Sequence, residues 1–93
     1  MYALETRDHV DKSFKKLTKR NHSQMELIAK KIEEILDDPH RFKPMHFPLA
    51  GMRRTHIGSF VILFSIDEQR KTVVIEDYAH HDRVYRAKTS MGA

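Results

Sequence analysis

The chain has 93 residues, a length that accommodates one domain with a single hydrophobic core. It contains no cysteine, which excludes a disulfide framework, a thiolate zinc site and a cysteine nucleophile. Seventeen Lys and Arg residues exceed thirteen Asp and Glu residues, and the resulting formal charge of +4 favours a polyanion or an acidic protein as partner.

The sequence indicates neither a membrane segment nor a targeting segment. The longest apolar run, residues 60–66, is far shorter than the roughly 20 residues that a spanning helix needs. The N-terminus carries charge within its first seven residues and does not read as a signal peptide. We therefore expect a cytoplasmic protein with no membrane partner, organised as one domain over residues 1–86 and a C-terminal tail over 87–93.

The N-terminal part predicts a short strand followed by two antiparallel helices. Residues 2–5 alternate as a strand does, and apolar residues then recur at helical spacing in two segments. Ser23, with Glu26 three residues later, makes the capping-box pattern, so we expect the second helix to begin there and to end before Pro39. The apolar stripes are Val10, Phe14 and Leu17 in the first helix and Met25, Ile28, Ile32, Ile35 and Leu36 in the second.

The C-terminal part predicts a small sheet. The middle apolar strand should be buried on both faces, and the last strand should alternate, with Val73, Ile75 and Asp77 on one face and Tyr78 on the other. The fold class expected is α+β, with both helices on one face of a twisted antiparallel sheet in the order β-α-α-β-β-β. The expected segments are a packed loop at 40–51, strands at 52–57, 59–66 and 72–78, and a turn at 67–70.

Basic and imidazole side chains occur at the ends of these strands. Cleavage of RNA through its own 2′-hydroxyl needs a base, an acid and fixed positive charge beside the phosphate, and the unperturbed pKa of histidine, about 6.5, suits both proton transfers. Strand alternation puts Arg54 and His56 on one face and Arg53 on the other. The predicted catalytic residues are His81, His56, Arg54 and Tyr85, and the predicted RNA-binding residues are Arg53, Arg83, His80 and Lys43.

Three of these residues have alternative interpretations. Tyr85 can stack on a base or donate a hydrogen bond to it, but it can equally anchor the C-terminus as a half-buried aromatic residue. His80 and His81 could bind a metal, but neighbouring residues of an extended chain point to opposite sides. No pair of histidines one helical turn apart accompanies a carboxylate either. We therefore expect neither a metal nor a cofactor.

Six segments, in this order and spacing, carry a family pattern: YAL at 2–4, FKKL at 14–17, IEEILDDP at 32–39, PLAG at 48–51, IGSF at 57–60 and IEDYAHHDRVY at 75–85. Over residues 2–86 the chain thereby resembles the RelE/ParE superfamily of toxins from type II toxin-antitoxin modules. The resemblance implies a helical hairpin on a compact sheet, cleavage of messenger RNA in the ribosome, and a cognate antitoxin that covers the basic surface.

Two positions depart from the pattern of the ribosome-dependent nucleases, which commonly carry arginine where this chain has Val61 and His81. A ParE-like inhibitor of DNA gyrase, or an inactive homologue that only binds its antitoxin, is therefore the alternative. A third possibility is a basic nucleic-acid-binding module without activity, whose binding would depend steeply on salt.

Overall fold

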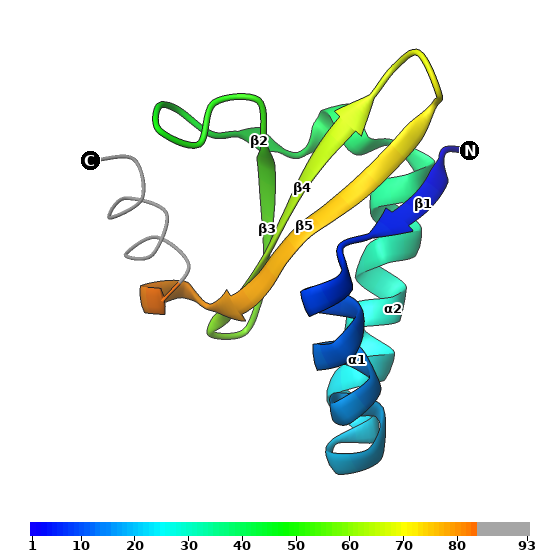
Figure 1. Ribbon diagram of the computed structural model, residues 1–93, viewed down its shortest axis with the longest axis vertical. Helices are drawn as coiled ribbons and strands as arrows, with labels where there is room; N and C mark the ends of the chain where they lie inside the picture. Colours follow the sequence, from blue (N-terminus) through cyan, green and yellow to red (C-terminus); the bar gives the residue numbers. More distant parts are fainter. Residues whose placement is uncertain (84–93) are drawn as a thin grey trace.

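The structure is a computed structural model that describes residues 1–83 of the chain. Two helices lie on one face of a five-stranded sheet with strand order β1-β5-β4-β3-β2 (Figure 1). The α+β class and the predicted β-α-α-β-β-β order are confirmed, with a two-residue strand added before the last three. The elements are β1 (Ala3–Thr6), α1 (Asp8–Arg20), α2 (His22–Asp37), the 3-10 turn η1 (Pro39–Arg41), β2 (Lys43–Pro44), β3 (Arg53–Ile57), β4 (Phe60–Asp67) and β5 (Thr72–His80).

The sheet is mixed, which corrects the expectation of a purely antiparallel one. Strand β1 pairs in parallel with β5, from Ala3 opposite Thr72 to Thr6 opposite Ile75. The other three pairings, β2 with β3, β3 with β4 and β4 with β5, are antiparallel. Parallel neighbours need a long crossover connection, and here the helical hairpin begins that connection after β1. Within residues 1–83, no helix is long and apolar enough to cross a membrane.

Helix α2 begins one residue before the predicted cap, so the expectation for Ser23 was wrong. The side chain of Asn21 caps the helix by accepting from the backbone N–H of Gln24 at 3.1 Å. Glu26 does not complete a capping box with Ser23 but lies 3.1 Å from the Nδ1 atom of His22. Asparagine is as good an N-cap as serine, and Asn21 occupies the break between the two helices, where its backbone is not helical.

The main core lies between the sheet and the helices, and it confirms both predicted apolar stripes. Phe64 is fully buried there and packs edge to face against Phe42, with the two ring centroids 5.8 Å apart. The fully or mostly buried members are Val10, Ile28, Ile32, Ile35, Ile57, Ile62, Phe64, Val73 and Ile75. The rest of the predicted stripes, Phe14, Leu17, Met25 and Leu36, pack against them in part-buried positions.

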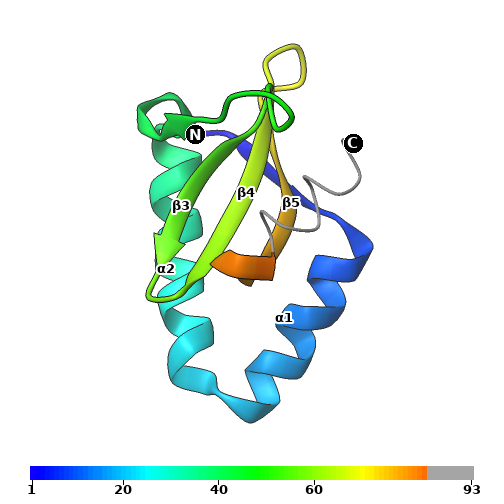
Figure 2. The same cartoon turned by 90° about the vertical axis from the view of Figure 1, so that its left-hand side faces the viewer.

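A smaller core lies on the opposite side of the sheet, called here the outer face because it is turned away from the helices (Figure 2). Val61 and Leu63 of β4 are fully buried there, and Leu49 from the loop before β3 packs on them. Strand β4 is therefore buried on both faces, as predicted. The loop is only partly packed, because Phe47 is 84% exposed.

A bulge in β5 changes the predicted alternation of that strand. Leu63 pairs with Asp77 and the next residue, Phe64, pairs with Ile75, so Glu76 is an extra residue on β5. A bulge reverses the facing of every residue beyond it. Tyr78 consequently packs in the main core beneath the helices, whereas Asp77 faces outward, opposite to the assignment from strict alternation.

Candidate functional site

The outer face carries positive charge along its β2–β3 edge. Lys43 of β2 lies directly opposite Arg54 of β3, and His56 follows two residues later on the same face of β3. Side chains of directly paired residues start about 5 Å apart, so Lys43 and Arg54 are neighbours. Lys43 and His56 are exposed and Arg54 is half-buried. We call these three residues the cationic edge.

The middle of the outer face is apolar. Val61 lies opposite His56, and Leu63 lies opposite Arg54, both on the central strand β4. Both side chains are fully buried and pack with Leu49. At residue 61, where the ribosome-dependent nucleases commonly carry arginine, this chain therefore has a valine whose side chain completes the smaller core.

The β5 side of the outer face is acidic, and its carboxylates have partners. Glu76 accepts from the Arg7 guanidinium at 2.9 and 3.3 Å and from the Ser65 hydroxyl at 2.7 Å. The hydrogen bond to Glu76 raises the pKa of Arg7. Asp77 lies 3.4 Å from the Nε2 atom of His9 on α1. The outer face is thus divided into a cationic edge, an apolar centre and an acidic side.

His80 and His81 lie at the β3–β4 turn, at the same end of the sheet as His56. The His81 backbone N–H donates to the carbonyl of Ser59 at 3.0 Å, and the His80 and His81 rings stack with centroids 4.5 Å apart. His56 and Ala79 flank Val61 in one row of the sheet, so their Cα atoms are separated by two strand spacings, about 10 Å. The structure therefore brings the three imidazoles to one end of the sheet, with His56 on β3 and the His80–His81 pair at the end of β5.

The remaining predicted residues are placed differently. Arg53 lies on the helix side of β3 and donates to the backbone carbonyls of His40 at 3.2 Å and Phe42 at 2.7 Å. Its guanidinium therefore fastens the chain after η1 to the sheet and is not part of the cationic edge. Arg83 is exposed and is the last residue that the structure describes, and Tyr85 lies outside the described residues.

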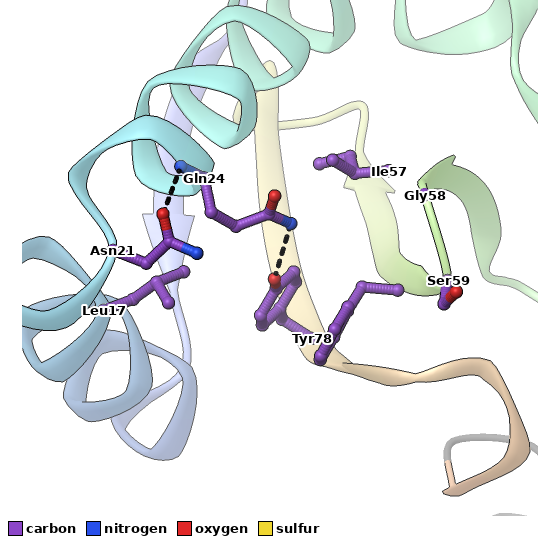
Figure 3. A pocket seen from close by; sticks show the side chains of 8 residues that line it. Leu17, Asn21, Gln24, Ile57, Gly58, Ser59 and Tyr78 are labelled. Atoms are coloured by element: carbon purple, nitrogen blue, oxygen red, sulfur yellow. Dashed lines mark hydrogen bonds between the residues drawn. The ribbon is translucent and has the colours of Figure 1, made fainter.

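A pocket of about 350 Å³ lies on the helix side of the sheet, between the helical hairpin and the β3–β4 turn. Figure 3 shows the Gln24 amide donating to the Tyr78 hydroxyl inside it, at 3.2 Å. Phe60 stacks on Tyr78 with ring centroids 5.1 Å apart. None of the predicted site residues lines this pocket, so it is separate from the cationic edge.

A polar cluster that the sequence analysis did not identify lies at the other end of the β4–β5 hairpin. Glu68 accepts from the Lys71 ammonium and the Tyr2 hydroxyl, each at 2.8 Å, and also contacts the His40 ring. These hydrogen bonds, with Lys71 the strongest, lower the pKa of Glu68 to about 2. The same contacts raise the pKa of Tyr2 and of Lys71. The cluster joins the N-terminus, η1 and the β4–β5 turn, so its position suits a structural role.

Comparison with known proteins places the chain in a family. Residues 2–85 match the family described as the ParE toxin of the type II toxin-antitoxin system parDE. The chain is 43% identical to the protein RelE4 of Methanocaldococcus jannaschii over 95% of both chains. It is 46% identical to a protein of Methanosarcina mazei, over 91% of this chain and all of that one.

Solved structures agree with the fold. The isolated RelE toxin of E. coli superposes with a TM-score of 0.72 at 16% identity, over 94% of this chain and 99% of that one. The toxin-antitoxin complex RelBE2 of Mycobacterium tuberculosis gives a TM-score of 0.64 at 26% identity, over 85% of this chain and 90% of that one. Together with the family match along residues 2–85, these similarities show that the chain is a toxin of the RelE/ParE superfamily and belongs to the ParE toxin family of type II toxin-antitoxin systems.

Proposed function

We propose that this toxin is an endoribonuclease that cleaves messenger RNA at the ribosome, with the cationic edge as its phosphate-binding surface. The observation that carries the proposal is the alignment of Lys43, Arg54 and His56 on one edge of the outer face. An exposed imidazole beside two cations provides a proton carrier and fixed positive charge in one place. Both are required when negative charge builds up on a phosphate.

The chemistry is an attack of the RNA on itself. The 2′-oxygen bonds to phosphorus as the bond to the 5′-oxygen breaks, which leaves a 2′,3′-cyclic phosphate and a free 5′-hydroxyl. One of His56 and His81 accepts the 2′-hydroxyl proton and the other protonates the leaving oxygen. Arg54, with Arg83, stabilises the charge on the phosphate, and Tyr85 orients a nucleotide by stacking.

The ribosome would supply much of the substrate positioning. The cationic edge follows the surface of a sheet, and the pocket described above lies on the other side of it. Holding the reacting groups in line is worth several kcal/mol of the barrier, and a surface site gains it most readily from a second surface. Messenger RNA in the decoding site would be presented in that way.

We further infer a cognate antitoxin as partner, because the RelBE2 structure is a complex of a toxin with its antitoxin. An antitoxin segment carrying Asp and Glu would complement the cationic edge and would exclude RNA from it. The bound toxin should therefore be inert, and oligomeric state would be set through the antitoxin.

A second function is favoured by one observation, the buried Val61. A nuclease site gains from a cation at this position, whereas the valine here is packed in the smaller core and can contact no phosphate, which fits a toxin that does not cleave RNA. The corresponding activity would be ParE-like inhibition of DNA gyrase, or antitoxin binding without catalysis.

Induced expression in cells distinguishes these functions. If the toxin is a nuclease, its expression should arrest translation, and messenger RNA should be cut within ribosome-bound codons. The product of the adjacent reading frame should then restore growth. Double-strand DNA breaks with an SOS response and intact messenger RNA would instead support the gyrase inhibitor and overturn the nuclease. Growth without either effect would also overturn it, provided that the folded toxin is detected in the cells.

A further inference from the structure

The end of β5 and the residues after it bring three potential metal ligands together. His80, His81 and Asp82 each offer one nitrogen or oxygen atom, and these atoms all lie within 4.8 Å of one another. From the sequence alone, the two histidines are expected on opposite sides of an extended chain. The structure differs because β5 ends at His80, and the chain turns there so that the two rings stack.

Hydrogen bonds define which nitrogen of each ring carries a lone pair. The Nδ1 atom of His81 lies 3.1 Å from the carbonyl oxygen of Ser59, which can only accept, so Nδ1 carries the hydrogen and Nε2 the lone pair of the neutral ring. The Nδ1 atom of His80 accepts from the backbone N–H of Asp82 at 3.3 Å, so it carries a lone pair, and a metal ion bound there would replace this long hydrogen bond.

Both lone pairs face the same carboxylate. The His81 Nε2 atom lies 3.0 Å from one oxygen of Asp82, and the His80 Nδ1 atom lies 3.9 Å from the other. Acceptors at these distances repel each other unless a positive charge lies between them, which is supplied either by a proton or by a metal ion. The side chains are 39%, 46% and 61% exposed for His80, His81 and Asp82, so an ion can reach them from solvent.

We propose that His80, His81 and Asp82 form a binding site for a divalent transition-metal ion of the zinc class. Two imidazole nitrogens and a carboxylate oxygen are a ligand set that Zn²⁺ accepts, with a fourth position left to water. Tetrahedral bonds of 2.0–2.2 Å separate ligand atoms by about 3.4 Å, so the three ligand atoms, which lie within 4.8 Å of one another, would need only a small side-chain adjustment to surround the ion. The Ser59 carbonyl is a second supporting feature, since metal-binding imidazoles usually donate their other N–H to such a group.

The site has a consequence that rests on the proposed nuclease. His81 is one of the two imidazoles assigned to proton transfer, and a bound metal occupies its Nε2 lone pair. Zinc would therefore inhibit RNA cleavage, and removal of the metal with a chelator would restore it. Asp82→Asn removes one ligand of the ion, so the ratio of its cleavage rates with and without zinc should stay near one, whatever its rate without zinc.

Calorimetric titration of the purified full-length toxin with Zn²⁺ alone tests the site without RNA. We expect one zinc ion per chain, no binding of Mg²⁺, and affinity lowered by at least about tenfold in His81→Ala and in Asp82→Asn. His22→Ala and His40→Ala are matched controls, because each of these exposed histidines also lies against a glutamate. Both controls should bind zinc as the parent does.

Several results would overturn the site. They are zinc binding that stays unchanged in both His81→Ala and Asp82→Asn, zinc binding lost in a control variant, and no stoichiometric binding by the parent. Thermal unfolding without zinc establishes that each variant is folded, and zinc should raise the midpoint of the parent but not that of His81→Ala. If zinc binds as expected and the metal-free toxin does not cleave RNA, the proposed nuclease fails and the metal site stands.

Discussion

Lys43 pairs directly with Arg54 across the β2–β3 ladder, so two cations lie side by side on the outer face of the sheet. Like charges at directly opposed positions of a sheet repel each other, and this repulsion has an energetic cost. An RNA phosphate at this edge would offset that cost. The two-residue strand β2 holds Lys43 beside Arg54.

The first prediction concerns the salt dependence of RNA binding by Lys43. Each phosphate contact to single-stranded RNA contributes about 0.7 to the slope of log K against log salt, because it releases a counterion. Lys43→Gln should lower that slope by about this amount and weaken binding at low salt. Filter binding of a short RNA over a series of salt concentrations measures it. Lys30→Gln on α2 is the control, and equal slopes for the two variants would contradict the assignment.

The second prediction compares two phenylalanines. Phe64 is fully buried in the main core, so Phe64→Ala should lower the free energy of unfolding by about 3–5 kcal/mol. Phe47 is 84% exposed, and Phe47→Ala should change it by less than about 0.5 kcal/mol. Urea denaturation followed by circular dichroism gives both values. Similar losses in the two variants would show that the loop before β3 is packed differently.

The third prediction concerns the start of α2. Asn21 caps the helix by accepting from Gln24, so Asn21→Ala should cost about 1 kcal/mol of unfolding free energy. Ser23 is the second residue of the helix and does not cap it, so Ser23→Ala should change the free energy of unfolding by less than about 0.5 kcal/mol. Chemical denaturation of both variants distinguishes the two caps. A larger loss in Ser23→Ala would support the capping box that the sequence suggested.

The fourth prediction is the acid sensitivity of the Glu68 cluster. The pKa of the Glu68 carboxyl group, about 2 in the folded protein, lies below its ordinary value. The contribution of Glu68 to the free energy of unfolding is therefore complete above about pH 4.5 and is lost as the pH falls toward 2. Glu68→Gln should therefore be less stable than the parent at pH 6, and the two should converge near pH 2. Thermal unfolding across this range measures the difference. Glu33→Gln on α2 is the control, and an unchanged pH profile in Glu68→Gln would contradict the role of the cluster.

Much of the fold could be predicted because the apolar spacing in each element matches its secondary structure. The helical stripe from Ile28 to Ile35 and the continuous apolar run of β4 are local signals, and the structure confirms both. The parallel pairing of β1 with β5 could not be predicted, since it joins segments some 70 residues apart. The bulge at Glu76 was equally hidden, because a single unpaired residue leaves no pattern in the sequence.

The candidate site was predictable in part. Alternation along β3 correctly separated Arg54 and His56 from Arg53, because these residues lie in a regular strand. That Arg53 binds the carbonyls of His40 and Phe42 could not be foreseen, as it depends on how the chain returns after η1. The stacking of His80 on His81 was missed because strand geometry was assumed to continue past the end of β5.

The most direct test of the nuclease is cleavage of a messenger RNA on ribosomes in a reconstituted translation reaction, mapped by primer extension. The parent should cut within ribosome-bound codons, and Arg54→Gln should slow cleavage on the order of 10²-fold, as loss of one charge-stabilising donor does. Arg70→Gln is the matched control, because Arg70 lies in the β4–β5 turn and pairs there with Asp67 and Glu5. It should cut like the parent. No cleavage by the folded parent, or full activity in Arg54→Gln, would contradict the account.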